Sequence, residues 1–150
     1  MSYGNEIYPE LREWILRRMG EPNNYSPWRH GNGVEMCPTI GFGRQKGHTW
    51  AILKFMIETY NEMPPVLYCT YHGLNTTNPI LGNMIRAGEV SETDAIAMRP
   101  FISSHGTLCR SIHTQILQPS VIILDRGIKL NHNHDTTMSA LPNTLKVVIG

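Results

Sequence analysis

The chain has 150 residues and a formal net charge of +1, and 41% of its residues are hydrophobic while 17% are charged. This length suffices for one domain with its own core, and the composition is globular, which excludes an intrinsically disordered chain. The near-neutral charge argues against a protein whose main task is non-specific nucleic-acid binding, because that task needs an excess of basic residues.

The first 35 residues are expected to form a helix and a loop. Residues 8–19 carry apolar residues at helical spacing, with Pro9 in the first turn and Gly20 just past the end. Residues 20–35 are rich in Pro, Asn and Gly, which is typical of a loop. We interpret residues 1–35 as an extension of a single domain that comprises residues 1–150.

Strands and helices alternate over the remainder of the chain. The apolar runs predict strands at residues 36–42, 66–71, 107–117, 120–125 and 145–149, and helices at residues 47–62, 78–88 and 91–99. Residues 127–143 are polar and are expected to form a loop. The unbroken apolar run at 120–125 is typical of a central parallel strand that is covered on both faces. We therefore expect an α/β fold of three layers, with a mainly parallel central sheet and helices on both faces.

The cysteines and the N-terminus bear on the compartment. Cys37, Cys69 and Cys109 are isolated and odd in number, and no CxxC pair or zinc-ligand spacing is present, which favours a reducing compartment. The chain begins with no basic-then-apolar leader, and no apolar run approaches the roughly 20 residues that span a bilayer. We expect a cytoplasmic protein without a membrane partner, located in the host cytoplasm if the chain is viral.

The segment between the first strand and the next helix has the composition of a phosphate-binding loop. Glycines let backbone N–H groups converge on an anion, and the helix that follows adds its N-terminal donors and dipole. Two basic side chains add positive charge, and a threonine hydroxyl is a suitable ligand for Mg²⁺. The nucleotide-binding candidates are Gly43, Arg44, Gln45, Lys46, Gly47, His48 and Thr49.

The match to the Walker A pattern, G-x-x-x-x-G-K-[ST], is incomplete. Gly47 and Thr49 fit it, but Phe42 stands at the first glycine position and His48 at the lysine position. A plain glycine turn before a buried helix is therefore an open alternative for this segment.

A second motif follows later in the chain, where the apolar strand 121–125 ends in Asp125. In P-loop proteins such an acid lies beside the phosphate loop and holds magnesium. An aspartate that caps a turn after a strand is the alternative. Because loop and acid occur together and in this order, we predict a site for ATP with Mg²⁺, in which Thr49 and Asp125 are the metal ligands.

These segments resemble the first ATPase domain of viral terminase large subunits and of superfamily helicases, which share the additional-strand P-loop fold. Residues 43–49 are similar to the family's G-R-Q-x-G-K-[ST], residues 120–125 to its acidic strand, and residues 145–150 to the strand that couples hydrolysis to motion. The strand at 66–70 and the helix that ends at 84–88 are similar to the segment after the loop helix. The resemblance covers residues 36–150 and implies a nucleotide-binding protein of viral or phage type, linked to DNA handling.

Two positions depart from the family's pattern. His48 replaces the lysine that contacts the phosphates, and Arg126 replaces the glutamate that polarises the attacking water. A neutral imidazole does not replace an ammonium group, whereas a protonated one does so in part. We therefore expect nucleotide binding with weak or lost hydrolysis, and we assign no catalytic residue.

Two other functions remain open. In the first, the chain is a non-catalytic protein that keeps the fold and binds another protein or a copy of itself. In the second, it is a nucleic-acid-binding module, which the low net charge disfavours as a sole function. The basic residues of that module would be Arg12, Arg17, Arg18, Arg44 and Lys46.

One further cluster has metal-binding residue types. On an extended strand, His132 and His134 would share a face beside Asp135. No third ligand with recognisable spacing accompanies them, which favours a solvated loop.

Overall fold

The computed structural model describes residues 4–20, 39–42, 47–114, 118–129, 131–141 and 143–150. Within these ranges five strands form one sheet in the order β1-β5-β4-β2-β3, and every strand pair is parallel. The strands are β1 (Thr39–Ile40), β2 (Val66–Thr70), β3 (Ile102–Ser104), β4 (Val121–Asp125) and β5 (Leu145–Ile149). The helices are α1 (Gly4–Gly20), α2 (His48–Thr59), α3 (Leu74–Arg86), α4 (Glu92–Met98), α5 (Leu108–Thr114) and α6 (His132–Ser139).

Strand β4 is the centre of the sheet, as its apolar run predicts. It pairs with β2 from Val66↔Val121 onward and with β5 from Val121↔Leu145 onward. Successive side chains of a strand point to opposite faces, so Ile123 enters one core and Ile122 and Leu124 enter the other. The predicted three-layer α/β fold is therefore confirmed.

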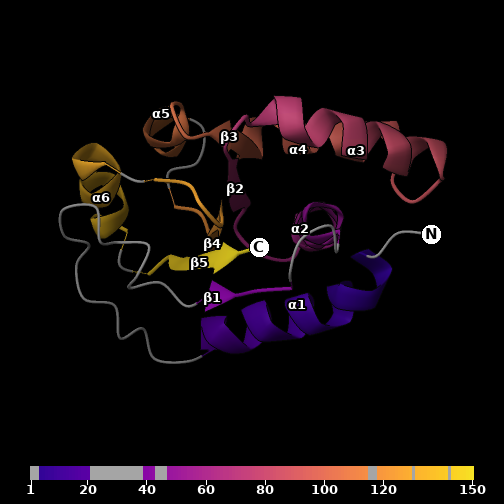
Figure 1. Cartoon of the computed structure of the whole chain (residues 1–150), viewed down its shortest axis with the longest axis horizontal. Helices are drawn as coiled ribbons and strands as arrows, with labels where there is room; N and C mark the ends of the chain where they lie inside the picture. The colour runs from indigo at the N-terminus through magenta and orange to yellow at the C-terminus, as the bar shows by residue number, and fades with distance from the viewer. Residues whose placement is uncertain (1–3, 21–38, 43–46, 115–117, 130, 142) are drawn as a thin grey trace.

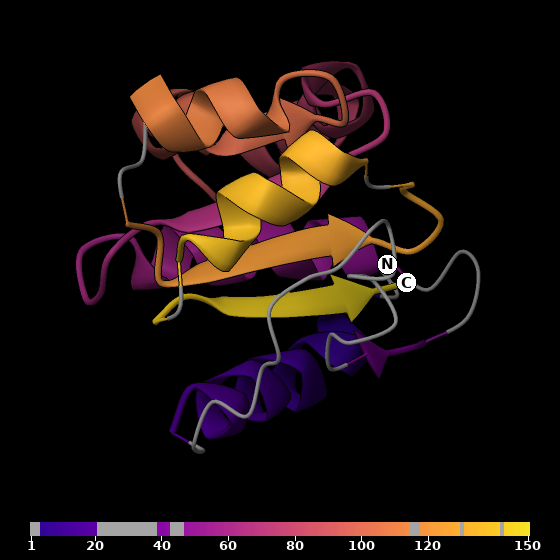
Figure 2. The same ribbon diagram turned by 90° about the vertical axis from the view of Figure 1, so that its left-hand side faces the viewer.

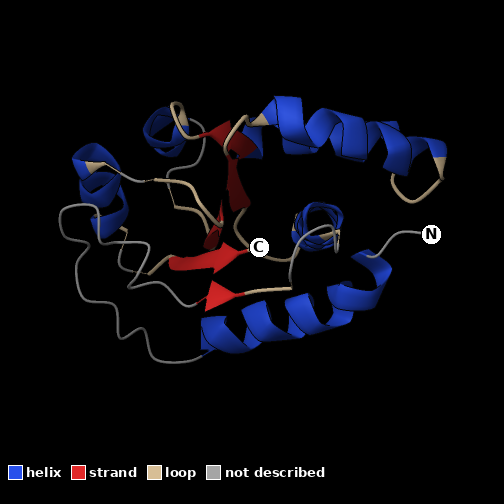
Figure 3. Ribbon diagram, in the orientation of Figure 1, coloured by secondary structure: helices blue, strands red, loops and turns tan. Residues whose placement is uncertain are grey.

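The larger core lies on the face that α1, α2, α3 and α4 cover (Figure 1; Figure 3). Helix α2 contacts α1, α3 and α4 as well as belonging to the same core, which explains why it is apolar on nearly every side. Buried side chains of this core include Leu11, Ile15, Ile52, Phe55, Leu81, Met84, Met98, Ile123 and Val147.

Helices α5 and α6 cover the opposite face (Figure 2). Two predictions were wrong here. Residues 107–117 were expected to be a strand, but Leu108 and Ile112 lie four residues apart and bury one side of the helix α5. The expected loop at 127–143 contains α6, which Asn131 caps and which buries Met138 against the sheet.

Two smaller differences concern the region after β2. Helix α3 was expected from residue 78 but begins at Leu74, because Gly73 turns the chain with a φ of 58°. The Gly73 carbonyl accepts hydrogen bonds from the Thr70 hydroxyl at 3.2 Å and from the Thr76 N–H at 3.0 Å. Strand β3 was not predicted, since its three residues are too few to show a period.

Helix α1 is longer than expected and is packed into the core. Tyr8, Leu11, Trp14 and Ile15 are buried, and the helix packs across α2, which is seen end-on in Figure 1. Its first residue, Gly4, touches the start of α2, because a methyl group there would come 2.9 Å from the Gly47 carbonyl oxygen and overlap the Trp50 ring.

In the described parts of the chain, no helix combines the length and the apolarity that crossing a bilayer requires.

Candidate functional site

The candidate residues that the structure describes meet at the carboxyl edge of the sheet. All strands are parallel, so the segments that follow them gather at one edge, which is where α/β proteins bind their ligands. Gly47, His48 and Thr49 start α2 after β1, and Asp125 ends β4. The predicted residues Gly43, Arg44, Gln45 and Lys46 lie outside the described residues.

The start of α2 has the backbone geometry of an anion-binding helix terminus. Gly47 is the N-cap residue, with φ 76° and ψ 27°, a left-handed conformation that glycine adopts without strain. Among the described residues no side chain caps the helix, and an intrahelical bond runs from the Ala51 N–H to the Gly47 carbonyl at 3.1 Å. With respect to these residues, the first N–H groups of α2 keep the donor capacity that binds phosphate in other proteins.

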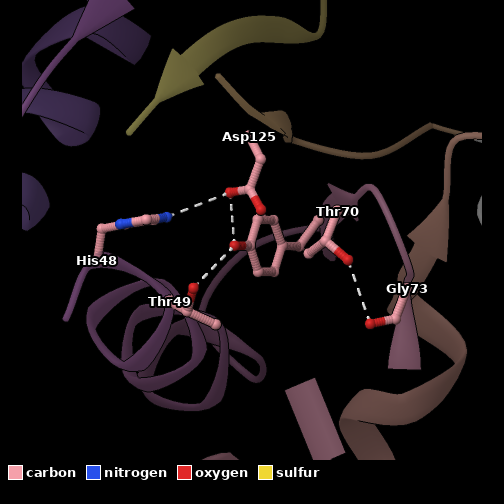
Figure 4. A network of polar contacts seen from close by, with 6 residues as sticks. His48, Thr49, Thr70, Gly73 and Asp125 are labelled. Atoms are coloured by element: carbon pink, nitrogen blue, oxygen red, sulfur yellow. Dashed lines mark hydrogen bonds and ion pairs between the residues drawn. The ribbon is translucent and has the colours of Figure 1, made fainter. Parts of the chain in front are cut away.

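The side chains at this edge form one polar network (Figure 4). The Tyr68 hydroxyl donates to Oδ1 of Asp125 at 2.7 Å, and Oγ1 of Thr49 lies 3.4 Å from the same hydroxyl. Nε2 of His48 lies 3.6 Å from Oδ1 of Asp125, a contact that is an ion pair when the imidazole is protonated. Thus His48 contacts Asp125 directly, and Thr49 is linked to Asp125 through a fourth residue, Tyr68, that was not predicted.

Tyr68 is that fourth residue, and it lies on β2 with no exposed surface. Burial raises the pKa of Tyr68 well above its usual value, and the neighbouring charge of Asp125 raises it further, so the hydroxyl keeps its proton. The one signal in the sequence is a tyrosine inside an apolar strand, since a buried hydroxyl needs a partner.

The oxygen atoms of the network fit the preference of Mg²⁺. Thr49 offers a hydroxyl and Asp125 a carboxylate, and both contact the same Tyr68 hydroxyl. No group of three or more His, Cys, Asp or Glu side chains within the described residues is placed to hold a metal. This composition suits an ion that keeps several waters and phosphate ligands, as Mg²⁺ does, rather than one enclosed by protein ligands.

Arg126 follows Asp125 and places a cation where the resembled family has a carboxylate. Its guanidinium lies beside Gly41, directly after β1, because a methyl group on Gly41 would come 2.9 Å from Nη2 of Arg126. The same edge is closed by Gly150, whose N–H donates to the Ile40 carbonyl at 3.2 Å and whose carbonyl accepts from the Phe42 N–H at 2.9 Å. A guanidinium cannot accept a proton from water, so Arg126 supplies no general base.

The histidine cluster at 132–135 differs from its prediction. These residues lie in α6 and not on an extended strand, so the geometry proposed for a metal pair is wrong. His134 is 4% exposed; its Nδ1 accepts from the Asn131 N–H at 3.0 Å, and its Nε2 lies 2.9 Å from the His105 carbonyl oxygen. Both ring nitrogens thus contact backbone groups, which indicates a structural role; the side chains of His132 and Asp135 lie outside the described residues.

The basic residues of α1 do not form a uniform positive face. Arg17 is exposed, but Glu6, Glu10 and Glu13 are exposed on the same helix. The guanidinium of Arg18 lies 5.5 Å from the centre of the Trp14 ring, which places it against the protein.

No protein-family model matches this chain, and neither a curated protein nor a solved structure matches it. We therefore infer the function from the residues and their geometry alone.

Proposed function

We propose that the protein binds ATP with Mg²⁺ at the start of α2 and hydrolyses it slowly or not at all. The observation that supports this most is the polar network, in which Thr49 and Asp125 contact the same buried hydroxyl. The phosphates would accept from the first N–H groups of α2. Thr49 and Asp125 would hold the Mg²⁺, which neutralises phosphate charge when bound.

The order of the strands also supports the proposal. Strand β5 lies between β1, which leads to the loop, and β4, which carries the acid. This order brings the segment after β1 and the acid at the end of β4 to the same edge of the sheet, on either side of β5. The viral or phage origin and the link to DNA are further parts of the proposal that the resemblance alone carries, and the cytoplasmic location is a part that rests on the isolated cysteines.

The expected loss of hydrolysis follows from two side chains. His48 is a cation only when protonated, and its Nε2 lies 3.6 Å from the carboxylate of Asp125. Arg126 provides no carboxylate to activate water. The described part of the site therefore offers donors that can bind phosphate, but neither a permanent cation at position 48 nor a carboxylate at position 126 to accelerate phosphoryl transfer.

Thermal unfolding with ATP, ADP or GTP, each with and without Mg²⁺, tests the proposal. A ligand at 100 times its dissociation constant adds about 2.7 kcal/mol to the free energy of unfolding, so a bound nucleotide raises the Tm. Thr49→Ala and Asp125→Ala are expected to reduce the Mg²⁺-dependent part of the shift, and His48→Lys to increase the whole shift.

Thr59→Ala is the matched control, because Thr59 is a buried threonine at the other end of α2 whose hydroxyl donates to the Phe55 carbonyl at 2.7 Å. Nucleotide shifts that none of the three site variants alters would show that the ligand binds elsewhere.

A second candidate is a non-catalytic protein that uses the same fold to bind another protein or its own copy. The contact between His48 and Asp125 favours it, because each of these side chains then partners the other instead of a ligand. This function predicts no nucleotide shift in the wild type and partner binding that survives the same three substitutions.

A further inference from the structure

The hydroxyl of Tyr68 occupies the centre of the candidate site. Tyr68 is in register with Ile123 of β4 and Ile102 of β3, and it belongs to the core beneath α2. Its ring extends toward the carboxyl edge, because its hydroxyl reaches Asp125, two residues beyond Ile123. The residue has no exposed surface, so the partners of the hydroxyl are set by the protein and not by bulk water.

The direction of each hydrogen bond in the network follows from counting protons. A phenol carries one proton, and at 2.7 Å from a carboxylate oxygen that proton is donated to Asp125. The contact of 3.4 Å with Thr49 therefore uses the Thr49 proton, with the Tyr68 oxygen as acceptor. The lone pairs of Thr49 Oγ1 are then not used by Tyr68, so this oxygen keeps the acceptor capacity that a cation ligand needs.

The carboxylate of Asp125 is held in the same way. The contacts of both Tyr68 and His48 fall on Oδ1, and neither falls on Oδ2. The side chain is 19% exposed, so the carboxylate remains open to the edge of the sheet. One oxygen is thus fixed to the protein while the other keeps its acceptor capacity.

We propose that Tyr68 is a positioning residue, whose hydroxyl orients Thr49 and Asp125 as a pair of magnesium ligands. This inference rests on the proposed nucleotide site and adds that the Mg²⁺ dependence of ATP binding requires the Tyr68 hydroxyl. Tyr68 touches neither nucleotide nor metal in this role; it acts through the two side chains that do.

Removal of the hydroxyl frees both ligands. In Tyr68→Phe the Thr49 hydroxyl loses its acceptor and can rotate to another χ1 rotamer. Asp125 then keeps His48 as its neighbour and loses the bond that fixes Oδ1. Loss of such an outer partner typically lowers metal affinity by about 10- to 100-fold.

Calorimetric titration of ATP into the full chain, once with Mg²⁺ and once with EDTA, measures this effect. The quantity of interest is the Kd in EDTA divided by the Kd in Mg²⁺. Tyr68→Phe is expected to lower that ratio by about 10- to 100-fold while leaving the Kd in EDTA unchanged. Tyr8→Phe is the matched control, since Tyr8 is also buried and donates its hydroxyl to a carboxylate, that of Glu58, yet it should leave the ratio unchanged.

Two non-canonical amino acids at position 68 complete the experiment. Tyr68→4-aminophenylalanine keeps a donor in the same place and should restore part of the wild-type ratio of the two Kd values. If Tyr68→Phe does not fold, Tyr68→4-methylphenylalanine fills the volume of the hydroxyl without donating a proton, and its ratio is then compared with that of the wild type instead.

The outcomes separate the two proposals. A wild-type ratio well above one that Tyr68→Phe leaves unchanged overturns the role of Tyr68 and leaves the nucleotide site intact. A wild type that binds ATP in neither condition overturns the proposed function, and the role of Tyr68 with it.

Discussion

Two polar clusters lie on opposite faces of the sheet, and each contains a buried polar group. The two groups differ in the kind of partner that they contact. On the α6 face both ring nitrogens of His134 contact backbone groups, those of Asn131 and His105. On the α2 face the contacts of the Tyr68 hydroxyl within the described residues are with side chains, those of Thr49 and Asp125, whose oxygens can still coordinate a ligand. A buried polar group whose partners are backbone groups stabilises the fold. One whose partners are side-chain oxygens can also orient those oxygens toward a ligand.

The largest expected effect tests the structural half of this comparison. His134→Ala leaves the Asn131 N–H and the His105 carbonyl without their partner and opens a cavity under α6. We expect the free energy of unfolding to fall by about 2–4 kcal/mol, measured by urea denaturation. ATP binding should be unaffected, and a loss below about 1 kcal/mol would contradict the structural role.

The support that α1 gives to the α2 cluster can be tested at Gly4. Gly4→Ala places a methyl group 2.9 Å from the Gly47 carbonyl oxygen and against the Trp50 ring, so we expect a loss of about 1–3 kcal/mol. The control is Gly20→Ala at the other end of α1, where an added methyl group meets nothing within 4 Å. Equal melting temperatures for the two variants would argue against close packing at Gly4.

The cap of α6 offers a finer test. The Asn131 side chain accepts from the His134 N–H at 3.0 Å, and Asn131→Ala removes that bond. A lost N-cap lowers the free energy of unfolding by about 1 kcal/mol, while Asn131→Asp keeps an acceptor and should change it little. Equal losses in the two variants would show that the acceptor oxygen does not matter.

The smallest expected effect on stability belongs to the proposed ligand of the metal. In Asp125→Asn the amide oxygen can still accept from Tyr68, and the side chain is partly exposed, so the free energy of unfolding should change by less than about 1 kcal/mol. The Mg²⁺-dependent part of ATP binding should nevertheless be lost, because the charge is gone. A large loss of stability with intact Mg²⁺ dependence would make Asp125 structural and remove the contrast between the clusters.

The sequence predicts those parts whose causes are local. The strands at 121–125 and 145–149 are predictable because each is buried on both faces and so is apolar throughout. Gly47, Thr49 and Asp125 could be predicted as candidates because a glycine turn, a hydroxyl and a carboxylate in these motifs are the groups that a phosphate and Mg²⁺ site requires. The short helices α5 and α6 are not, since one or two buried apolar residues each leave no clear period.

The place of Tyr68 in the site could not be predicted from the sequence. Its partner Asp125 is 57 residues away, and only the parallel pairing of β2 with β4 brings the two together. A tyrosine in an apolar strand indicates a need for a partner but does not say which residue meets it.

The position of Gly150 has a practical consequence for measuring ligand binding. Its backbone pairs with Ile40 and Phe42, which lead toward the predicted loop, and it adjoins Arg126. Because these two hydrogen bonds tie the end of β5 to residues 40 and 42, an opening of this edge would break both of them together. Under the proposed function, hydrogen exchange at the Phe42 and Gly150 amides should slow when ATP and Mg²⁺ are added, so these two amides can report the occupancy of the site.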